Sequence, residues 1–316
     1  MKNKTASSPT AVSGGPTLTF MLFALFALPA HAFATLHIVA TTPDLADITR
    51  QIGGDQVKVE ALAKGTEDIH AVPQRPSFVP KLNQADAVVL IGLEAEHAFL
   101  PALLEVAQNP KILRDKPGYI DCSEGMAPLD VPQNLSRANG ELHAEGNPHY
   151  NFDPRKGGQI AGNIAKGLSR IDPAHAAAYA KNLETFKTML AAKQAEWKQL
   201  AAPLRGIKAV SHHADMVYLA DALGIELVGT VELKPGIPPT PKHLEELAQL
   251  MKEQHVPLII HEIQYPSDTA QWLAQQTGAK IADIATMGNA FPDSKTYVGM
   301  IGHNIHALLD AVKAHG

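Results

Sequence analysis

The fold is decided by residues 172–203, which read DPAHAAAYAKNLETFKTMLAAKQAEWKQLAAP. Between the two prolines of this stretch there is no glycine and no further proline, and the helix-favouring residues Ala, Lys, Glu, Gln and Leu predominate. Asp172 is a suitable N-cap residue, and Pro173 fits the first helical position, where a backbone N–H has no helical partner. Bulky side chains recur three, four or seven residues apart on one helical face: Tyr179, Leu183, Phe186, Leu190, Trp197 and Leu200. The pattern predicts one long helix of about 40 Å.

The segments before and after this helix have the same rhythm of short apolar strands and helices. Strands are predicted at 36–40, 57–62, 87–92 and 119–122, and again at 207–210, 225–231, 257–260 and 279–284. Helices are predicted between them at 43–52, 78–85, 94–107 and 157–170, then at 214–223, 241–254, 267–277 and 293–314. Strands that alternate with helices predict parallel sheets. We therefore expect an α/β fold with two lobes, at 33–171 and 204–316, joined by the rigid helix 172–203.

The N-terminus predicts export. Two lysines precede the apolar run Leu18–Leu28, and Ala30-His31-Ala32 provides a small-x-small cleavage site. The run is too short to be a transmembrane anchor, which needs about 20 apolar residues. We expect residues 1–32 to be a signal peptide cleaved near Ala32. The single cysteine, Cys122, lies far from this site, so no lipid-bearing cysteine is expected there, and a location in the periplasm is favoured.

Composition narrows the class of protein. The chain has 316 residues with a formal net charge of −5, and no cluster of Lys and Arg is interleaved with aromatic residues, so nucleic-acid binding is not expected. One cysteine excludes a disulfide within the chain. The compositional anomaly is histidine, which occurs 15 times.

Four side chains that can bind a metal follow, or lie near, the ends of predicted strands: His70, His149, His213 and Asp283. Ligands of parallel sheets bind beyond the carboxyl ends of the strands. Two of the four precede the long helix and two follow it, so we expect them to meet between the lobes. Three imidazoles and one carboxylate suit Zn²⁺. Taken singly, each histidine is also compatible with an ordinary surface or capping role.

The motifs around these residues resemble those of a known family. They are Asp68-Ile69-His70, Asn147-Pro148-His149 with Asp153-Pro154, Ser211-His212-His213 with Tyr218 and Gly224, and Asp283 followed by Thr296-Tyr297-Val298-Gly299-Met300. Together they are similar to the zinc/manganese ABC-transporter solute-binding proteins, over essentially the whole mature chain. The Asn-Pro-His motif is the most specific piece of the resemblance.

The resemblance implies two α/β lobes bridged by a rigid helix, with one metal ion between them, held by residues matching His70, His149, His213 and Asp283. It also implies a monomer without catalytic residues that delivers the ion to an ABC permease in the inner membrane. Members with histidine at the third position resemble zinc importers, whereas manganese members tend to carry glutamate there. His213 therefore favours Zn²⁺. One departure is that residues 124–148 contain only His143, where zinc members often have a histidine-rich loop.

Several alternatives stay open at this point. Mn²⁺ is the alternative cargo of the same class of protein. A zinc-dependent hydrolase is a rival of another class, but the chain has no His-Glu-x-x-His motif, and Asp283 would fill the position that a catalytic water needs. An adhesin-like surface protein is a further rival. Glu262, at a predicted strand end, is a candidate for ligation or for orienting an imidazole, and water is another candidate for the fourth ligand.

Overall fold

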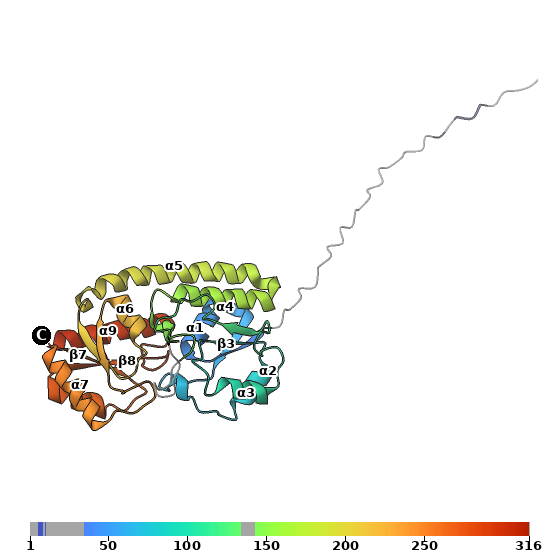
Figure 1. Cartoon of the computed structure of the whole chain (residues 1–316). Helices are drawn as coiled ribbons and strands as arrows, with labels where there is room; N and C mark the ends of the chain where they lie inside the picture. Colours follow the sequence, from blue (N-terminus) through green and yellow to red (C-terminus); the bar gives the residue numbers. More distant parts are fainter. Residues whose placement is uncertain (1–5, 9, 11–34, 134–142, 316) are drawn as a thin grey trace, which may run out of the picture. The chain divides into compact units, whose positions relative to one another are not determined.

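Two four-stranded parallel sheets form the framework of the chain, with strand orders β2-β1-β3-β4 and β6-β5-β7-β8. The computed structural model describes residues 6–8, 10, 35–133 and 143–315. The first sheet contains β1 Leu36–Ala40, β2 Val57–Ala61, β3 Ala87–Leu90 and β4 Tyr119–Asp121; the second contains β5 Lys208–Ser211, β6 Glu226–Thr230, β7 Leu258–Glu262 and β8 Lys280–Ile284. The two sheets thus repeat one topology, and the predicted fold class is confirmed (Figure 1).

Nine α-helices are assigned within the described residues. They are α1 Pro43–Gly53, α2 Phe78–Gln84, α3 Leu100–Ala107, α4 Gly157–Ile171, α5 Ala176–Leu200, α6 Val217–Leu223, α7 Pro241–Glu253, α8 Asp268–Thr277 and α9 Tyr297–His315. The helix predicted at 94–107 begins only at Leu100. Leu93 and Glu94 have positive φ angles of 50° and 64°, which an α-helix does not allow, so the chain forms turns before the helix starts. The last helix begins at Tyr297 rather than at 293. The carboxylate of Asp293, which the sequence places at the start of this helix, contacts the ring of His303.

The long helix α5 contacts helices that pack on both sheets. It lies against α1 and α4 of the first sheet and α9 of the second (Figure 1). Its buried face consists of Tyr179, Phe186, Leu190 and Trp197, as the spacing predicts. Its start differs from the prediction: a 3-10 turn, Pro173–His175, comes first, and Asp172 makes no capping hydrogen bond. The Asp172 carboxylate instead accepts the Tyr179 hydroxyl at 2.6 Å, so it pins the first turns of α5 by a side-chain contact.

The two halves are joined by packing and by hydrogen bonds. The larger hydrophobic cluster includes buried residues from both sheets and from α5, and residues 35–316 form one compact unit. The Asp47 carboxylate accepts the backbone N–H of Tyr297 at 2.9 Å. A Cβ on Gly65 would lie 2.4 Å from backbone atoms of 288–290. Only glycine, which has no side chain, allows the loop at Gly65 to come this close to the second half. The boundaries of the lobes at 33–171, 172–203 and 204–316 stay a prediction.

The predicted signal peptide and its cleavage site lie outside the described residues, apart from four positions near the start. Within the described parts of the chain, no helix is long and apolar enough to cross a membrane. Cys122 is fully buried, as expected for a small apolar side chain in the core.

Candidate metal centre

Three of the four predicted ligands converge on one point. Potential ligand atoms of His70, His149 and His213 all lie within 4.8 Å of one another, and each side chain is at most 7% exposed. Ligands of a tetrahedral zinc ion, at 2.0–2.1 Å from the metal, lie about 3.3 Å apart, so a small contraction brings the three imidazoles to that spacing. The histidines come from loops beyond β2, beyond β4 and beyond β5, which is where parallel sheets bind ligands.

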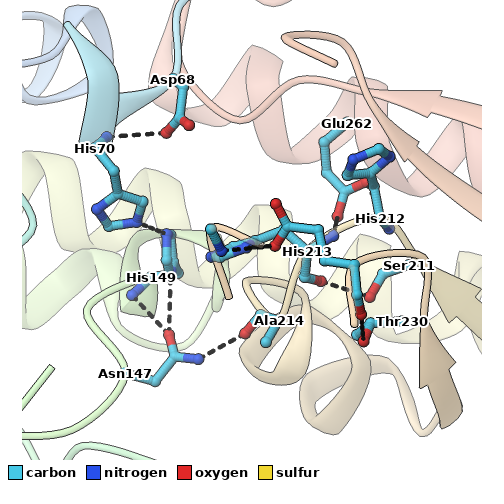
Figure 2. Close-up of polar contacts among 12 residues, drawn as sticks. Asp68, His70, Asn147, His149, Ser211, His212, His213, Ala214, Thr230 and Glu262 are labelled. Carbon is cyan, nitrogen blue, oxygen red and sulfur yellow. Dashed lines mark hydrogen bonds and ion pairs between the residues drawn. The ribbon is translucent and has the colours of Figure 1, made fainter. Parts of the chain in front are cut away.

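His70 sits in the short 3-10 turn Ile69–Ala71, which Asp68 starts by accepting the His70 backbone N–H at 2.9 Å. The Nε2 atoms of His70 and His149 lie 3.0 Å apart (Figure 2). Two ring nitrogens at this distance form a hydrogen bond when one of them carries a proton. A metal ion that replaces this contact needs both Nε2 lone pairs, so each ring then carries its proton on Nδ1. Because the Asp68 carboxylate accepts the His70 backbone N–H, it positions the turn that carries His70.

His149 is oriented by Asn147, two residues before it. The Asn147 side-chain oxygen accepts the His149 backbone N–H at 3.1 Å and lies 2.9 Å from Nδ1 of the ring. This contact places the proton on Nδ1 and leaves the Nε2 lone pair for a metal. The Asn147 amide also donates to the carbonyl of Ala214 at 2.7 Å, which ties the His149 loop to the His213 loop (Figure 2).

His213 is oriented by two carboxylates. Its Nδ1 donates to Glu232 Oε2 at 2.6 Å, so Nε2 is again the nitrogen free for a metal. The backbone N–H groups of His212 and His213 donate to the two oxygens of Glu262 at 3.0 and 3.1 Å. Glu262 is completely buried and therefore holds the loop, while Glu232 holds the ring. Of the two roles considered for Glu262, these contacts support the orienting of an imidazole, through the backbone of the loop that carries His213, and ligation stays a prediction.

The electrostatics of the centre favour neutral imidazoles at two positions. Burial, followed by the neighbouring histidines, holds the pKa of His70 and of His149 well below the ordinary value. For His213, burial acts in the same direction, but the hydrogen bond to Glu232 and the nearby carboxylates outweigh it and raise the pKa. His213 is therefore the first of the three to be protonated as the pH falls.

Asp283 does not join the three histidines. Its Oδ1 lies 2.6 Å from Nδ1 of His261, the residue beside it on β7, and its side chain is 57% exposed. Strand residues alternate between the two faces of a sheet, and this position on β8 faces solvent rather than the centre. The expectation that Asp283 completes the metal shell is therefore corrected, and we leave it out of the ligand set.

Other polar residues surround the centre without belonging to the histidine group. The ring of His143 lies 4.8 Å from that of His70, and burial, with His97 beside it, lowers the pKa of His143 to about 4. The ring of His212 stacks on the ring of Tyr265, with the ring centres 4.0 Å apart. The nearby carboxyl of Asp215 is buried, and burial, then the adjacent Glu262, hold its pKa well above the ordinary value.

Two cavities meet at the histidines. The first measures about 10 Å³, which is room for one small species, and its walls include His70, His149, His213 and Asp215. The second measures about 80 Å³, and His149 and His213 line it together with His143. The centre is thus a site for a single ion, next to a larger cavity.

A family model described as ZnuA, zinc-uptake complex component A, periplasmic, matches residues 38–311. The chain belongs to this family. Among its relatives is the metal ABC transporter substrate-binding lipoprotein ScbA of Streptococcus cristatus, 25% identical over 87% of this chain and 85% of that protein. Another is the manganese ABC transporter substrate-binding lipoprotein PsaA of Streptococcus pneumoniae, 24% identical over 87% of this chain and 85% of that protein. A crystal structure of ZnuA superposes with a TM-score of 0.74 at 25% identity, covering 88% of this chain and 99% of that one.

Membership of the ZnuA family makes the chain a component of a metal-uptake complex, as the motifs around the histidines predict. The residues that sequence analysis missed are Glu232, which orients His213, and Asp215, on the cavity wall. A signal existed for both. Glu232 comes soon after a predicted strand, as the histidines do, and Asp215 follows His213 by two residues.

Replacing Glu232 with glutamine is expected to lower zinc affinity about 10–100-fold, as is typical when the acceptor behind a metal-bound histidine is altered. The amide accepts the His213 N–H more weakly than the carboxylate and lowers the basicity of the ring. The measurement is competition for zinc with a chelator at neutral pH. Glu226→Gln, at an exposed position at the start of β6, the strand that precedes Glu232, is the control and is expected to leave the affinity unchanged. Equal affinities for both variants would contradict the role of Glu232.

Proposed function

We propose that this chain is the periplasmic solute-binding protein of an ABC transporter, that it captures one Zn²⁺ ion with His70, His149 and His213, and that it delivers the ion to a membrane permease. The observation that carries the proposal is the convergence of three buried imidazoles from three separate loops. Two of them have their outward nitrogens held by Asn147 and Glu232, so that the inward nitrogens face one point. Such preorganisation is typical of metal sites.

The choice of Zn²⁺ rests on the donor set. Imidazole nitrogens suit Zn²⁺, whereas Mn²⁺ prefers carboxylate, carbonyl and water oxygens. Three of the donors are imidazole nitrogens, whichever group completes the shell. Mn²⁺ is the competing cargo, since relatives of this chain are named manganese transporter proteins. The two ions therefore have to be compared directly.

Transport is favoured over hydrolysis. A zinc hydrolase needs a bound water with a general base within reach. Near the histidines, Glu262 is occupied by two backbone N–H groups and Glu232 by the ring of His213, so neither faces the ion as a base. Binding and release of the ion explain this arrangement without a chemical step. We further propose that the protein acts as a monomer in the periplasm, after removal of residues 1–32.

Calorimetric titration of the metal-stripped mature protein tests the proposal. We expect one Zn²⁺ per chain and a markedly weaker affinity for Mn²⁺, because the three donors are nitrogens. The same samples assayed with ester and peptide substrates are expected to show no hydrolysis that scales with zinc content. Tighter binding of Mn²⁺ would overturn the zinc assignment, and failure to bind either ion would overturn the proposed function.

A further inference from the structure

We propose that Asp215 supplies the fourth ligand of the metal ion held by His70, His149 and His213. The inference rests on the proposed function, because it concerns the same ion. Three imidazoles occupy three corners of a tetrahedral shell, and a closed zinc site takes its fourth ligand from the protein as well. The question is which oxygen or nitrogen near the histidines is placed to do so.

Asp215 lies on the wall of the cavity that the three histidines line. It follows His213 by two residues, in a loop whose path is fixed on both sides of Ala214. The His213 backbone N–H donates to Glu262 at 3.1 Å, and the Ala214 carbonyl accepts the Asn147 amide at 2.7 Å. The contacts that position His213 therefore also fix the loop that carries Asp215. The Asp215 carboxyl lies on the cavity wall but outside the group of ligand atoms within 4.8 Å of one another, so its side chain has to turn toward the ion on binding.

The Asp215 carboxyl also has an atom without a partner. The side chain is 2% exposed, and its Oδ1 is buried with no hydrogen-bond partner among the described residues. A buried polar oxygen left unpaired costs free energy, and such atoms are rare in folded proteins. A cation in the adjoining cavity provides the missing partner. On the same wall, Oδ1 of Asp68 already accepts the backbone N–H of His70, and the hydroxyl of Thr286 already donates to a glutamine. Oδ1 of Asn151 is likewise buried without a partner, but an amide brings no negative charge to a cation.

Charge leads to the same assignment. A divalent cation bound by neutral imidazoles carries its full charge into a buried site, which is costly unless a carboxylate pairs with it. Asp215 provides that carboxylate from within the cavity wall. Asp283 is exposed and bound to His261, and His143 would add a nitrogen without adding negative charge. Asp215 is thus the residue whose burial, position and charge all fit.

The test compares Asp215→Asn with Asp283→Asn in the mature full chain, by zinc titration in competition with a chelator. Both substitutions preserve side-chain size and remove one potential carboxylate ligand. We expect Asp215→Asn to weaken zinc binding by about tenfold or more, since even residues behind a metal ligand typically account for 10–100-fold. Asp283→Asn is expected to bind like the unmodified chain. The reverse result, or equal binding by all three proteins, would overturn the inference.

A crystal structure of the zinc-loaded unmodified protein gives a second readout that does not depend on how a variant folds. We expect an oxygen of Asp215 at about 2.0–2.2 Å from the zinc ion. A water molecule, His143 or Asp283 in that position would overturn the inference while leaving the proposed function intact. Absence of zinc binding by the unmodified protein would instead refute the proposed function itself.

Discussion

Replacing His149 with alanine is expected to lower zinc affinity by well over 100-fold, more than the 10–100-fold typical of residues that only support a ligand. His149 lies close to both of the other histidines. Its Nε2 is 3.0 Å from that of His70, and its ring is 5.6 Å, centre to centre, from that of His213. Its removal therefore takes away one of the three nitrogens that face the ion. Titration with zinc measures the loss directly.

The thermal stabilisation that zinc provides is a second readout of the same substitution. A ligand that binds only the folded state stabilises it by about 2.7 kcal/mol at 100 times its dissociation constant. Zinc is expected to raise the melting temperature of the unmodified protein and to leave that of His149→Ala almost unchanged. The matched control is His306→Ala, which removes an exposed histidine of α9 far from the cluster in sequence. An undiminished zinc-induced shift in His149→Ala would exclude His149 from the site.

The fold could be predicted well from local patterns. Residues 36–40 and 57–61 read as strands because apolar residues run together or alternate there, and the long helix is marked by the absence of glycine and proline. Errors lie at element ends. Residues 94–99 have helix-compatible composition, but the positive φ angles of Leu93 and Glu94 direct the chain into turns. Nothing in side-chain composition signals that backbone choice, because tertiary contacts decide it.

The candidate site also has a part that local sequence predicts and a part that it does not. The three histidines were found because each is polar, can bind metal and lies beyond a predicted strand, and the structure brings them within 4.8 Å. Asp283 is also a polar, metal-binding residue near a predicted strand end, but it lies within β8 and its side chain is turned toward solvent. A one-residue difference in strand register moves a side chain to the opposite face, and sequence alone does not resolve strand ends that finely. Glu232 and Asp215 lie close in sequence to a predicted strand end and a predicted ligand, but the contacts that give each its role come from tertiary structure.

Lowering the pH is expected to release zinc in two stages. A histidine binds metal only when its inward nitrogen is unprotonated, so protons compete with zinc and the affinity falls as the pH falls. His213 has a raised pKa because Glu232 stabilises its charged form, and it is therefore the first of the three to gain a proton as the pH falls. His70 and His149, whose pKa values burial lowers, take up protons only at more acidic pH.

The first stage should cost about tenfold in affinity per pH unit, and the second up to about 1,000-fold per unit, because each competing proton contributes a factor of ten. The dissociation constant of zinc, measured by chelator competition from pH 8 to pH 4.5, tests this course. In Glu232→Gln the His213 ring loses its carboxylate partner, so its pKa falls and the first stage moves to lower pH. At neutral pH the unmodified protein is accordingly expected to release more protons on binding zinc than Glu232→Gln does, which calorimetry in buffers of different ionisation enthalpy detects. A dissociation constant that stays level from pH 8 to pH 5 would show that these imidazoles do not hold the ion, since no nitrogen ligand of ordinary basicity escapes competition with protons over that range.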